Sequence, residues 1–137
     1  MKIYFAGSVT GGREDQEFYG QIIKELQDFG DVLTEHLANQ NLSALGESLT
    51  AQQIFQRDMA WLKQADVVVA EVTTPSLGVG YEIGQAESLG KSILCLFREL
   101  PGKRVSGMVR GNPQIKALAY KDIGEVKNIL QTFFNSI

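Results

Sequence analysis

The chain has 137 residues, of which 44% are hydrophobic and 21% charged, and this composition is typical of one folded domain over residues 1–137. The 16 acidic and 13 basic residues leave a formal net charge of −3, which disfavours a nucleic-acid polymer as partner and requires any phosphate to be held locally. No apolar stretch approaches the roughly 18 residues of a membrane span and no secretory leader is recognisable, so we expect a cytoplasmic protein with no membrane partner.

Apolar runs alternate with stretches of helical period along the whole chain, which indicates strands separated by helices. In chain order the pattern predicts a strand at Lys2–Ala6, a helix from the Gly7–Gly12 loop to Gly30, a strand at Asp31–Thr34, a helix from the capping residue Thr50 to Gln64, a strand at Val67–Glu71, a helix from the Thr73–Gly80 turn to Gly90, a strand at Ser92–Phe97, a short strand at Ala117–Tyr120 and a helix at Glu125–Phe134.

This alternation predicts a doubly wound α/β fold, in which a mostly parallel sheet is covered by helices on both faces. In a five-stranded sheet of the flavodoxin-like order 2-1-3-4-5, the first and third strands are neighbours and the strand order reverses between them. Ligands of such folds bind at the carboxyl ends of the strands at this reversal. The loops Gly7–Gly12 and Thr73–Gly80 are therefore expected to face each other across one site.

The first loop combines glycines, whose backbone amides can approach an anion, with an arginine at the start of a helix. The candidate phosphate ligands are Gly7, Ser8, Val9, Thr10, Gly11, Gly12 and Arg13. The spacing resembles a P-loop superficially, but Arg13-Glu14 stands where that motif has Lys-Ser/Thr, so the hydroxyl that holds magnesium is missing. Hydrolysis of nucleoside triphosphates is not expected, and a tight turn without a ligand is the alternative interpretation.

The second loop also ends at the start of a helix, where the Ser76 hydroxyl and free backbone amides could hold an anion. Its glycines, Gly78, Gly80 and Gly84, do not match the dinucleotide-binding motif because the last gap is one residue too long. Glycine turns of this kind are common, so the loop alone leaves the function open.

Glu82 is an acidic residue on the inward face of the third predicted helix. It shares the spacing of Ala86 and Leu89, so its carboxylate points toward the core. Burial raises the pKa of a carboxylate, whereas the positive end of the helix opposes that change and favours the ionised form. Both a catalytic carboxylate and a helix-capping glutamate fit this placement.

Asp58 shows a similar anomaly on the second predicted helix, where it lies four residues from both Ile54 and Leu62. Two inward carboxylates beside one cleft are suited to acid–base or nucleophilic chemistry at a glycosidic carbon. An ordinary ion pair with Arg57 or Lys63 is the alternative interpretation of Asp58.

Three further features bear on the site. Tyr4 could place its hydroxyl beside Glu82 or pack in the core, and His36 lies near the same rim or in a solvated loop. One histidine and one cysteine, Cys95 in an apolar run, do not support a zinc site, and neither a metal nor a cofactor is predicted. The segment Arg98–Arg110 carries four basic residues against one acidic residue, which fits a flap over an anion, a subunit contact or a solvated loop.

These residues resemble the 2′-deoxynucleoside 5′-phosphate N-hydrolases, also called Rcl, within the nucleoside 2-deoxyribosyltransferase superfamily. The resemblance runs nearly end to end, through Tyr4–Ser8, Gly11–Asp15, Leu33–His36, Ala65–Thr73, Pro75–Glu82 and Ile93–Arg98. It implies cleavage of the N-glycosidic bond of deoxynucleoside 5′-monophosphates to a free base and 2-deoxyribose 5-phosphate.

The resemblance also implies roles for single residues. Glu82 would attack the anomeric carbon and form a covalent deoxyribosyl intermediate, with Asp58 as the acid–base partner and Tyr4 orienting the nucleophile. The implied contacts are Ser76 and Gly78 with the 5′-phosphate, Ile22 and His36 with the base, and Ser106, Gly107 and Met108 with the phosphate of a neighbouring subunit in a homodimer. Thr10 departs from the animal enzymes, which have an arginine there, so the preference for monophosphates depends on whether Arg13 compensates.

Two other functions fit the same residues. A deoxyribosyltransferase would share the site but exchange bases on unphosphorylated nucleosides. A nucleotide- or flavin-binding module would use both loops without chemistry and would bind its ligand tightly.

Overall fold

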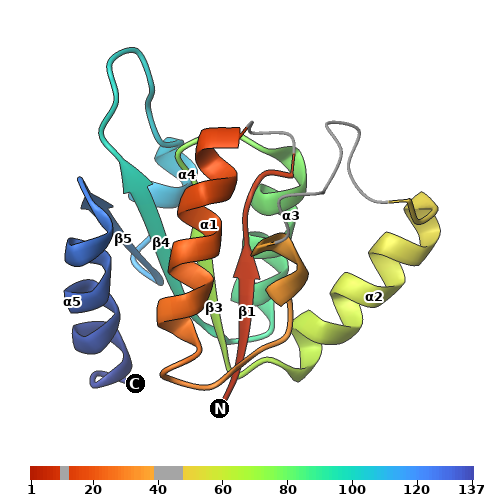
Figure 1. Ribbon diagram of the computed structural model, residues 1–137. Coiled ribbons are helices and arrows are strands. Elements are labelled where there is room, and N and C mark those ends of the chain that lie inside the picture. The colour runs from red at the N-terminus through yellow and green to blue at the C-terminus, as the bar shows by residue number, and fades with distance from the viewer. Residues whose placement is uncertain (10–12, 39–47) are drawn as a thin grey trace.

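Five parallel strands form one sheet of order β2-β1-β3-β4-β5 in the computed structural model, which describes residues 1–9, 13–38 and 48–137. The strands are β1 (Lys2–Ala6), β2 (Asp31–Val32), β3 (Val67–Glu71), β4 (Ser92–Arg98) and β5 (Ile115–Tyr120). The predicted fold class and strand order are confirmed. Because β1 and β3 are neighbours, the strand order reverses between them, and their carboxyl ends meet at one edge (Figure 1).

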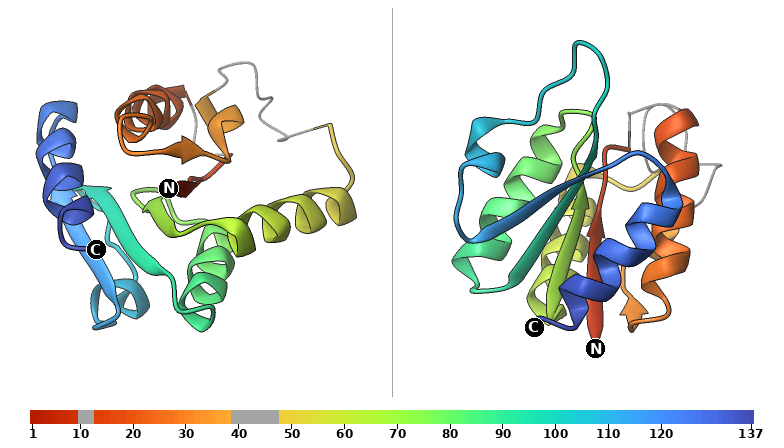
Figure 2. Two further views of the ribbon diagram at one scale, coloured as in Figure 1. Left: turned by 90° about the horizontal axis from the view of Figure 1, so that it is seen from below. Right: turned by 90° about the vertical axis from the view of Figure 1, so that its left-hand side faces the viewer.

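Helices cover both faces of the sheet (Figure 2). They are α1 (Arg13–Leu26), the 3-10 helix η1 (Glu35–Ala38), α2 (Ala51–Gln64), α3 (Leu77–Ser88), α4 (Gly107–Arg110) and α5 (Ile123–Phe134). Helices α1 and α5 lie on one face, and α2 and α3 lie on the other. This division decides which strand side chains can reach a site between α2 and α3.

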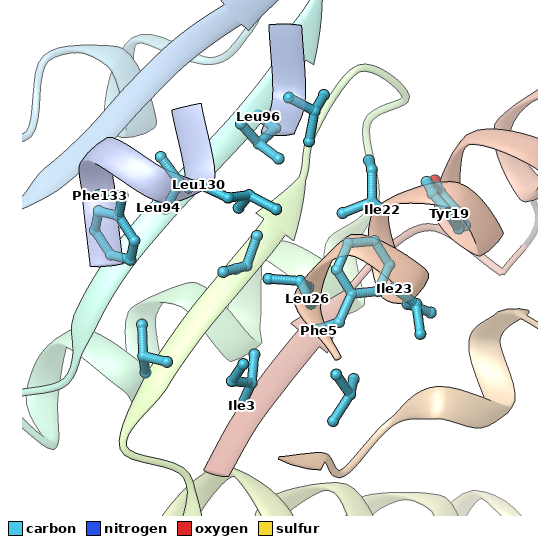
Figure 3. Packing of buried hydrophobic residues seen from close by; sticks show 14 of the residues in the cluster. Ile3, Phe5, Tyr19, Ile22, Ile23, Leu26, Leu94, Leu96, Leu130 and Phe133 are labelled. Carbon is cyan, nitrogen blue, oxygen red and sulfur yellow. The ribbon is translucent and has the colours of Figure 1, made fainter. Parts of the chain in front are cut away.

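Side chains of β1 alternate between the two faces, as the pleat of a strand requires. Ile3 and Phe5 belong to the hydrophobic core beneath α1 and α5, the same cluster as Ile22 of α1 (Figure 3). Tyr4 and Ala6 belong to the second core, beneath α2 and α3. The alternation therefore places Tyr4 on the same side of the sheet as the two predicted carboxylates.

Local signals fix where the two helices of the site begin. The Thr50 hydroxyl accepts the backbone N–H of Gln53 at 3.2 Å, and the Gln53 side chain accepts the Thr50 N–H at 3.0 Å, which completes the capping box of α2. The Ser76 hydroxyl caps α3 by accepting the N–H of Val79 at 3.3 Å. Beyond the end of α3, Gly90 adopts a φ of +67°, a conformation that favours glycine.

Several elements differ from the sequence prediction. Strand β2 ends at Val32 rather than at Thr34, and the Thr34 hydroxyl instead accepts the N–H of Phe5 at 2.8 Å and donates to its carbonyl at 2.7 Å. Strand β5 begins at Ile115, earlier than the predicted Ala117. Helix α5 begins earlier than predicted, after the capping residue Asp122, and the four-residue helix α4 was not predicted because one turn has no readable period.

Candidate active site

A cavity of about 360 Å³ opens at the carboxyl ends of β1 and β3. It is lined by Tyr4, Gly7, Val9, Thr34, His36, Leu37, Leu49, Ala51, Ile54, Arg57, Asp58, Ser76, Gly78, Val79 and Glu82. The reversal of strand order predicts a site at this edge of the sheet. Parts of both predicted anion-binding loops line it, together with both predicted carboxylates.

Tyr4 and Glu82 are in direct contact in this cavity. The Tyr4 hydroxyl donates a hydrogen bond of 2.7 Å to Oε1 of Glu82. Tyr4 comes from the middle of β1 and is buried, whereas Glu82 comes from the first half of α3 and remains partly accessible. The carboxylate is therefore held in one direction by a rigid strand while its other oxygen stays available to the cavity.

Burial controls the protonation of Glu82. It raises the pKa of Glu82 from its usual value near 4.5 to about 7, with the Asp58 carboxylate adding to the rise. The hydrogen bond from Tyr4 and the positive charge of Arg57 act in the opposite direction. The same burial, together with the charge of Glu82, raises the pKa of Tyr4, so the phenol stays a donor. At neutral pH, Glu82 is thus poised between its protonated and ionised forms.

Asp58 faces the same cavity from α2 and is paired with its neighbour. Nε and Nη2 of Arg57 both lie 2.8 Å from Oδ1 of Asp58. The Arg57 guanidinium also lies over the ring of Trp61, with 4.8 Å from its central carbon to the ring centroid. The ring of Trp61 is 5.5 Å from that of His36. The ion pair considered from the sequence is therefore present, and it lies inside the cavity rather than away from it.

The first loop reaches the cavity through Gly7 and Val9. Ser8 is buried, and its backbone N–H donates to the Tyr19 hydroxyl at 3.0 Å. A methyl group on Gly7 would lie 2.9 Å from the Tyr19 ring, so only glycine fits without a shift of that ring. Thr10, Gly11 and Gly12 lie outside the described residues, and of Arg13 only its place as the first residue of α1 is described.

Ser76 and Gly78 line the cavity at the start of α3, where the backbone N–H groups of the first turn point out of the helix. Such a helix start attracts anions. The two residues stand as the sequence predicts for a phosphate site on the β3–α3 loop.

Besides Ser8, the predicted contact residues Ile22, Ser106, Gly107 and Met108 lie outside this cavity. Ile22 is a correction, because its side chain is wholly buried in the core between α1 and the sheet, on the face opposite Tyr4. Ser106 and Met108 instead line a second groove of about 580 Å³ between α3 and α4, and Gly107 begins α4. Ser76 lines both hollows, so the groove adjoins the cavity.

Some cavity residues were not predicted as part of the site. Leu37, Leu49 and Ile54 add apolar side chains to its lining, and Thr34 adds a buried residue with a hydroxyl. The sequence signal was strongest for Arg57, a cation next to an inward carboxylate, which was considered only as an ion-pair partner.

Within residues 1–9, 13–38 and 48–137, no group of three or more histidine, cysteine, aspartate or glutamate side chains could hold a metal ion. Over the same part of the chain, none of the helices has the length and apolar character needed to cross a bilayer.

Comparison with known proteins places this geometry in context. Residues 3–128 match the nucleoside 2-deoxyribosyltransferase family. A 5-hydroxymethyl-dUMP N-hydrolase of Danio rerio is 49% identical over 141 residues, which cover 100% of this chain and 98% of the relative. The 5-hydroxymethyl-dUMP N-hydrolase of Rattus norvegicus is 50% identical over 139 residues, covering 98% of this chain and 85% of the relative. The solved structure of a CMP N-glycosidase of Clostridium botulinum has the same fold, with a TM-score of 0.69 at 19% identity over 96% of this chain and 99% of the other.

Proposed function

The chain belongs to the nucleoside 2-deoxyribosyltransferase family, and we propose that it hydrolyses 2′-deoxynucleoside 5′-monophosphates through a covalent deoxyribosyl intermediate on Glu82. The resemblance that the motifs indicate is confirmed, as is the prediction of an N-glycosidase that acts on deoxynucleotides. The products are a free base and 2-deoxyribose 5-phosphate. The intermediate and the roles of single residues belong to the proposal, and the geometry of the cavity supports them.

The observation that carries the proposal is the Tyr4–Glu82 hydrogen bond of 2.7 Å in a cavity that Asp58 also lines. A carboxylate fixed by a phenol is oriented for attack, and a second carboxylate can exchange protons with the leaving base. A 2′-deoxyribosyl group lacks the electron-withdrawing 2′-hydroxyl, so positive charge at its anomeric carbon is comparatively accessible. Two carboxylates can therefore suffice for this reaction.

The reaction proceeds in two displacements. In the first, ionised Glu82 forms a bond to the anomeric carbon, and the electron pair of the broken N-glycosidic bond leaves with the base, which takes a proton from Asp58. In the second, Asp58 accepts a proton from water, the water oxygen bonds to the anomeric carbon, and the Glu82 carboxylate is released.

The 5′-phosphate is assigned to the loops at the carboxyl edge of the sheet. Ser76 and Gly78 supply a hydroxyl and the first-turn amides of α3, and Gly7 and Val9 line the same cavity from the loop that follows β1.

The proposal includes a two-fold dimer in which Ser106 reaches the phosphate of the neighbouring subunit. Ser106 is exposed and lies on the groove that adjoins the cavity, beside Leu77 and Met108, which are 97% and 84% exposed. Large apolar side chains with this exposure fit a subunit contact. A cytosolic location also belongs to the proposal, since the single cysteine excludes an internal disulfide.

The direct test is incubation of the protein with deoxynucleoside and ribonucleoside 5′-monophosphates, followed by chromatography of the released base. The panel includes 5-hydroxymethyl-dUMP because of the names of the relatives. Glu82→Gln should release no base while its circular dichroism is unchanged, and Glu25→Gln, on α1, should keep the wild-type rate. Base release by Glu82→Gln at the wild-type rate would refute the role of Glu82.

The covalent intermediate has its own test. Asp58→Asn slows both displacements, but with a substrate whose base leaves without being protonated only the second stays slow, because no carboxylate then activates water. Acid-quenched Asp58→Asn should therefore carry a 2-deoxyribose 5-phosphate adduct on the peptide that contains Glu82, detected by mass spectrometry. Hydrolysis with inversion at the anomeric carbon and no adduct would contradict the intermediate.

Base exchange is the second candidate function, and the family match favours it because its description is that of a transferase. A deoxyribosyl intermediate can be opened by a second base as well as by water. Adding a different free base during turnover should divert product to a new nucleotide if transfer competes, whereas a pure hydrolase gives only the sugar phosphate.

A further inference from the structure

A buried polar cluster lies directly beneath the loops to which the phosphate is assigned. It consists of Asp15 in the first turn of α1, Glu71 at the end of β3, Thr73 and Thr74 in the β3–α3 loop, and Arg98 at the end of β4. We call these five residues the loop-anchor cluster. Asp15, Glu71, Thr73 and Arg98 are all at least nine-tenths buried, and none of the five lines the cavity.

Asp15 joins the two loops to each other. One oxygen of its carboxylate accepts from Nη2 of Arg98 in a buried ion pair, and the other accepts from the Thr74 hydroxyl. Thr74 lies two positions before Ser76, and Asp15 lies two positions after Arg13. A single carboxylate thus fixes the start of α1 against the loop that leads to α3.

Glu71 and Thr73 hold the same loop from the strand side. Oε1 of Glu71 accepts from both the N–H and the hydroxyl of Thr73. The Thr73 hydroxyl in turn accepts the backbone N–H of Arg98 at 2.9 Å. These contacts connect the ends of β3 and β4 and fix where the β3–α3 loop leaves the sheet.

The cluster also reaches the segment that carries Ser106. Nζ of Lys103 donates to the Thr74 hydroxyl at 3.2 Å, and Arg98 precedes this segment, which projects beyond the strand ends (Figure 1). Three separate segments with predicted phosphate contacts therefore connect to this cluster. Those contacts come from the β1–α1 loop, the β3–α3 loop and the segment that leads from β4 to Ser106.

Stability alone does not account for such a cluster. A buried ion pair is often no more stabilising than apolar side chains of similar volume. Among the described residues, Oε2 of Glu71 and Nε of Arg98 are buried without a hydrogen-bond partner, which is a further cost. Burial also raises the pKa of Glu71, so the folded protein disfavours its charge. What the cluster supplies is a fixed geometry between loops.

We propose that the loop-anchor cluster positions the start of α1 and the β3–α3 loop as one phosphate-binding unit, and so sets the preference for phosphorylated over unphosphorylated substrate without touching the substrate. This inference rests on the proposed function for the location of the phosphate. Asp15, Glu71, Thr73, Thr74 and Arg98 are positioning residues under this proposal.

The test compares each variant on a deoxynucleoside 5′-monophosphate and on the same deoxynucleoside without phosphate. Asp15→Asn should raise KM for the monophosphate about tenfold or more, with a much smaller change in kcat, because misplaced loops lose charge-assisted contacts with the phosphate. The kcat/KM for the nucleoside should change by less than about twofold. A merely structural role would instead lower kcat/KM for the monophosphate and for the nucleoside by the same factor.

Thr74 gives a milder variant if Asp15→Asn fails to fold. Thr74→Val removes the hydroxyl that bonds Asp15 while keeping the shape of the side chain, and Thr74→Ser restores the hydroxyl. Only Thr74→Val should lose discrimination between the two substrates. The control is Glu25→Gln, at the other end of α1, which removes a carboxylate 3.9 Å from Lys127. It should change kcat/KM for neither substrate.

Calorimetry with 2-deoxyribose 5-phosphate separates this inference from the proposed function. If the wild type turns over no deoxynucleotide, the proposed function fails, and binding of this sugar phosphate decides the inference by itself. Asp15→Asn or Thr74→Val should weaken that binding about tenfold relative to wild type. Unchanged binding, or an equal loss on both substrates by folded variants, would overturn the positioning role.

Discussion

Tyr4 donates its phenol hydrogen to Glu82 across 2.7 Å, although the two residues lie 78 positions apart in the chain. One comes from β1 and the other from the helix that follows β3, so the contact depends on the parallel pairing of these two strands. A phenol that donates to a carboxylate favours the ionised form and fixes its direction. The strand order thereby determines the orientation of the proposed nucleophile and favours its ionised form, against the larger opposing effect of burial.

The pH dependence of kcat/KM should be bell-shaped, with its acid limb set by Glu82. Attack requires ionised Glu82, whose pKa is about 7, so activity should rise as the pH increases through that value. A falling limb is expected at higher pH, where the leaving base no longer receives a proton. Initial rates at subsaturating substrate measure the profile, and a flat profile from about pH 4 to 9 would contradict the carboxylate pair.

Tyr4→Phe should move that acid limb to higher pH. The hydrogen bond from Tyr4 lowers the pKa of Glu82, so its removal leaves burial less opposed. The rate at neutral pH should fall about tenfold or more, with partial recovery at alkaline pH. Tyr120→Phe is the matched control, because Tyr120 is equally buried but lies in the core beneath α1 and α5. An unshifted limb in Tyr4→Phe would show that the phenol does not act on Glu82.

Stability should depend on pH through the same carboxylate. Between its usual value near 4.5 and its folded value near 7, Glu82 binds a proton in the folded state but not in the unfolded state. Its contribution to the free energy of unfolding therefore falls as the pH rises across this window. Glu82→Gln should match the wild type near pH 4 and be more stable at pH 8, by about 1–3 kcal/mol. Urea unfolding at the two pH values measures this difference, and equal stability at both would contradict a raised pKa.

The sequence predicts the fold and most of the cavity because both follow from periodicity. The inward position of Glu82 and Asp58 on their helices identified both carboxylates, and the first predicted strand supplied Tyr4. All three lie in one cavity. The reversal of strand order predicted the edge of the sheet at which the cavity lies. Each of these signals can be read from a short stretch of sequence. The parallel pairing of neighbouring strands then brings the residues together at one edge of the sheet.

Ile22 shows where the family resemblance misleads. The resemblance implied that Ile22 contacts the base, but it does not say which face of the sheet the helix covers. Helix α1 packs on the face opposite α2 and α3, so Ile22 lies in the core rather than beside a base. Likewise, the position of Arg57 depends on the rotation of α2 and on stacking over Trp61, which sequence spacing does not determine.

Arg57 should orient Asp58 through its guanidinium shape as well as its charge. Two of its nitrogens lie 2.8 Å from the same carboxylate oxygen, a contact that an ammonium group cannot reproduce. Arg57→Lys should therefore lower kcat about tenfold. Arg57→Met should lower kcat further and also move the acid limb of the pH profile to higher pH, since the cation lowers the pKa of Glu82. Full activity in Arg57→Lys would reduce the role of Arg57 to charge alone.

Subunit mixing tests whether Ser106 acts on the neighbouring site. If it does, Ser106→Ala and Glu82→Gln are each impaired as pure dimers, but a mixed dimer has one site with an intact Glu82 and an intact Ser106 from its partner. Random mixing of equal amounts makes about half of the dimers mixed, so the activity should recover to about a quarter of the wild-type rate. If Ser106 acts within its own subunit, the mixed dimer has no complete site and mixing restores nothing. A single-mutant subunit mixed with wild type controls for exchange.

Leu77→Asp, which places a charge on the exposed apolar groove, should abolish recovery by preventing association, and sedimentation velocity should then show a monomer. Recovery without association, or a fully active monomer, would refute the shared site.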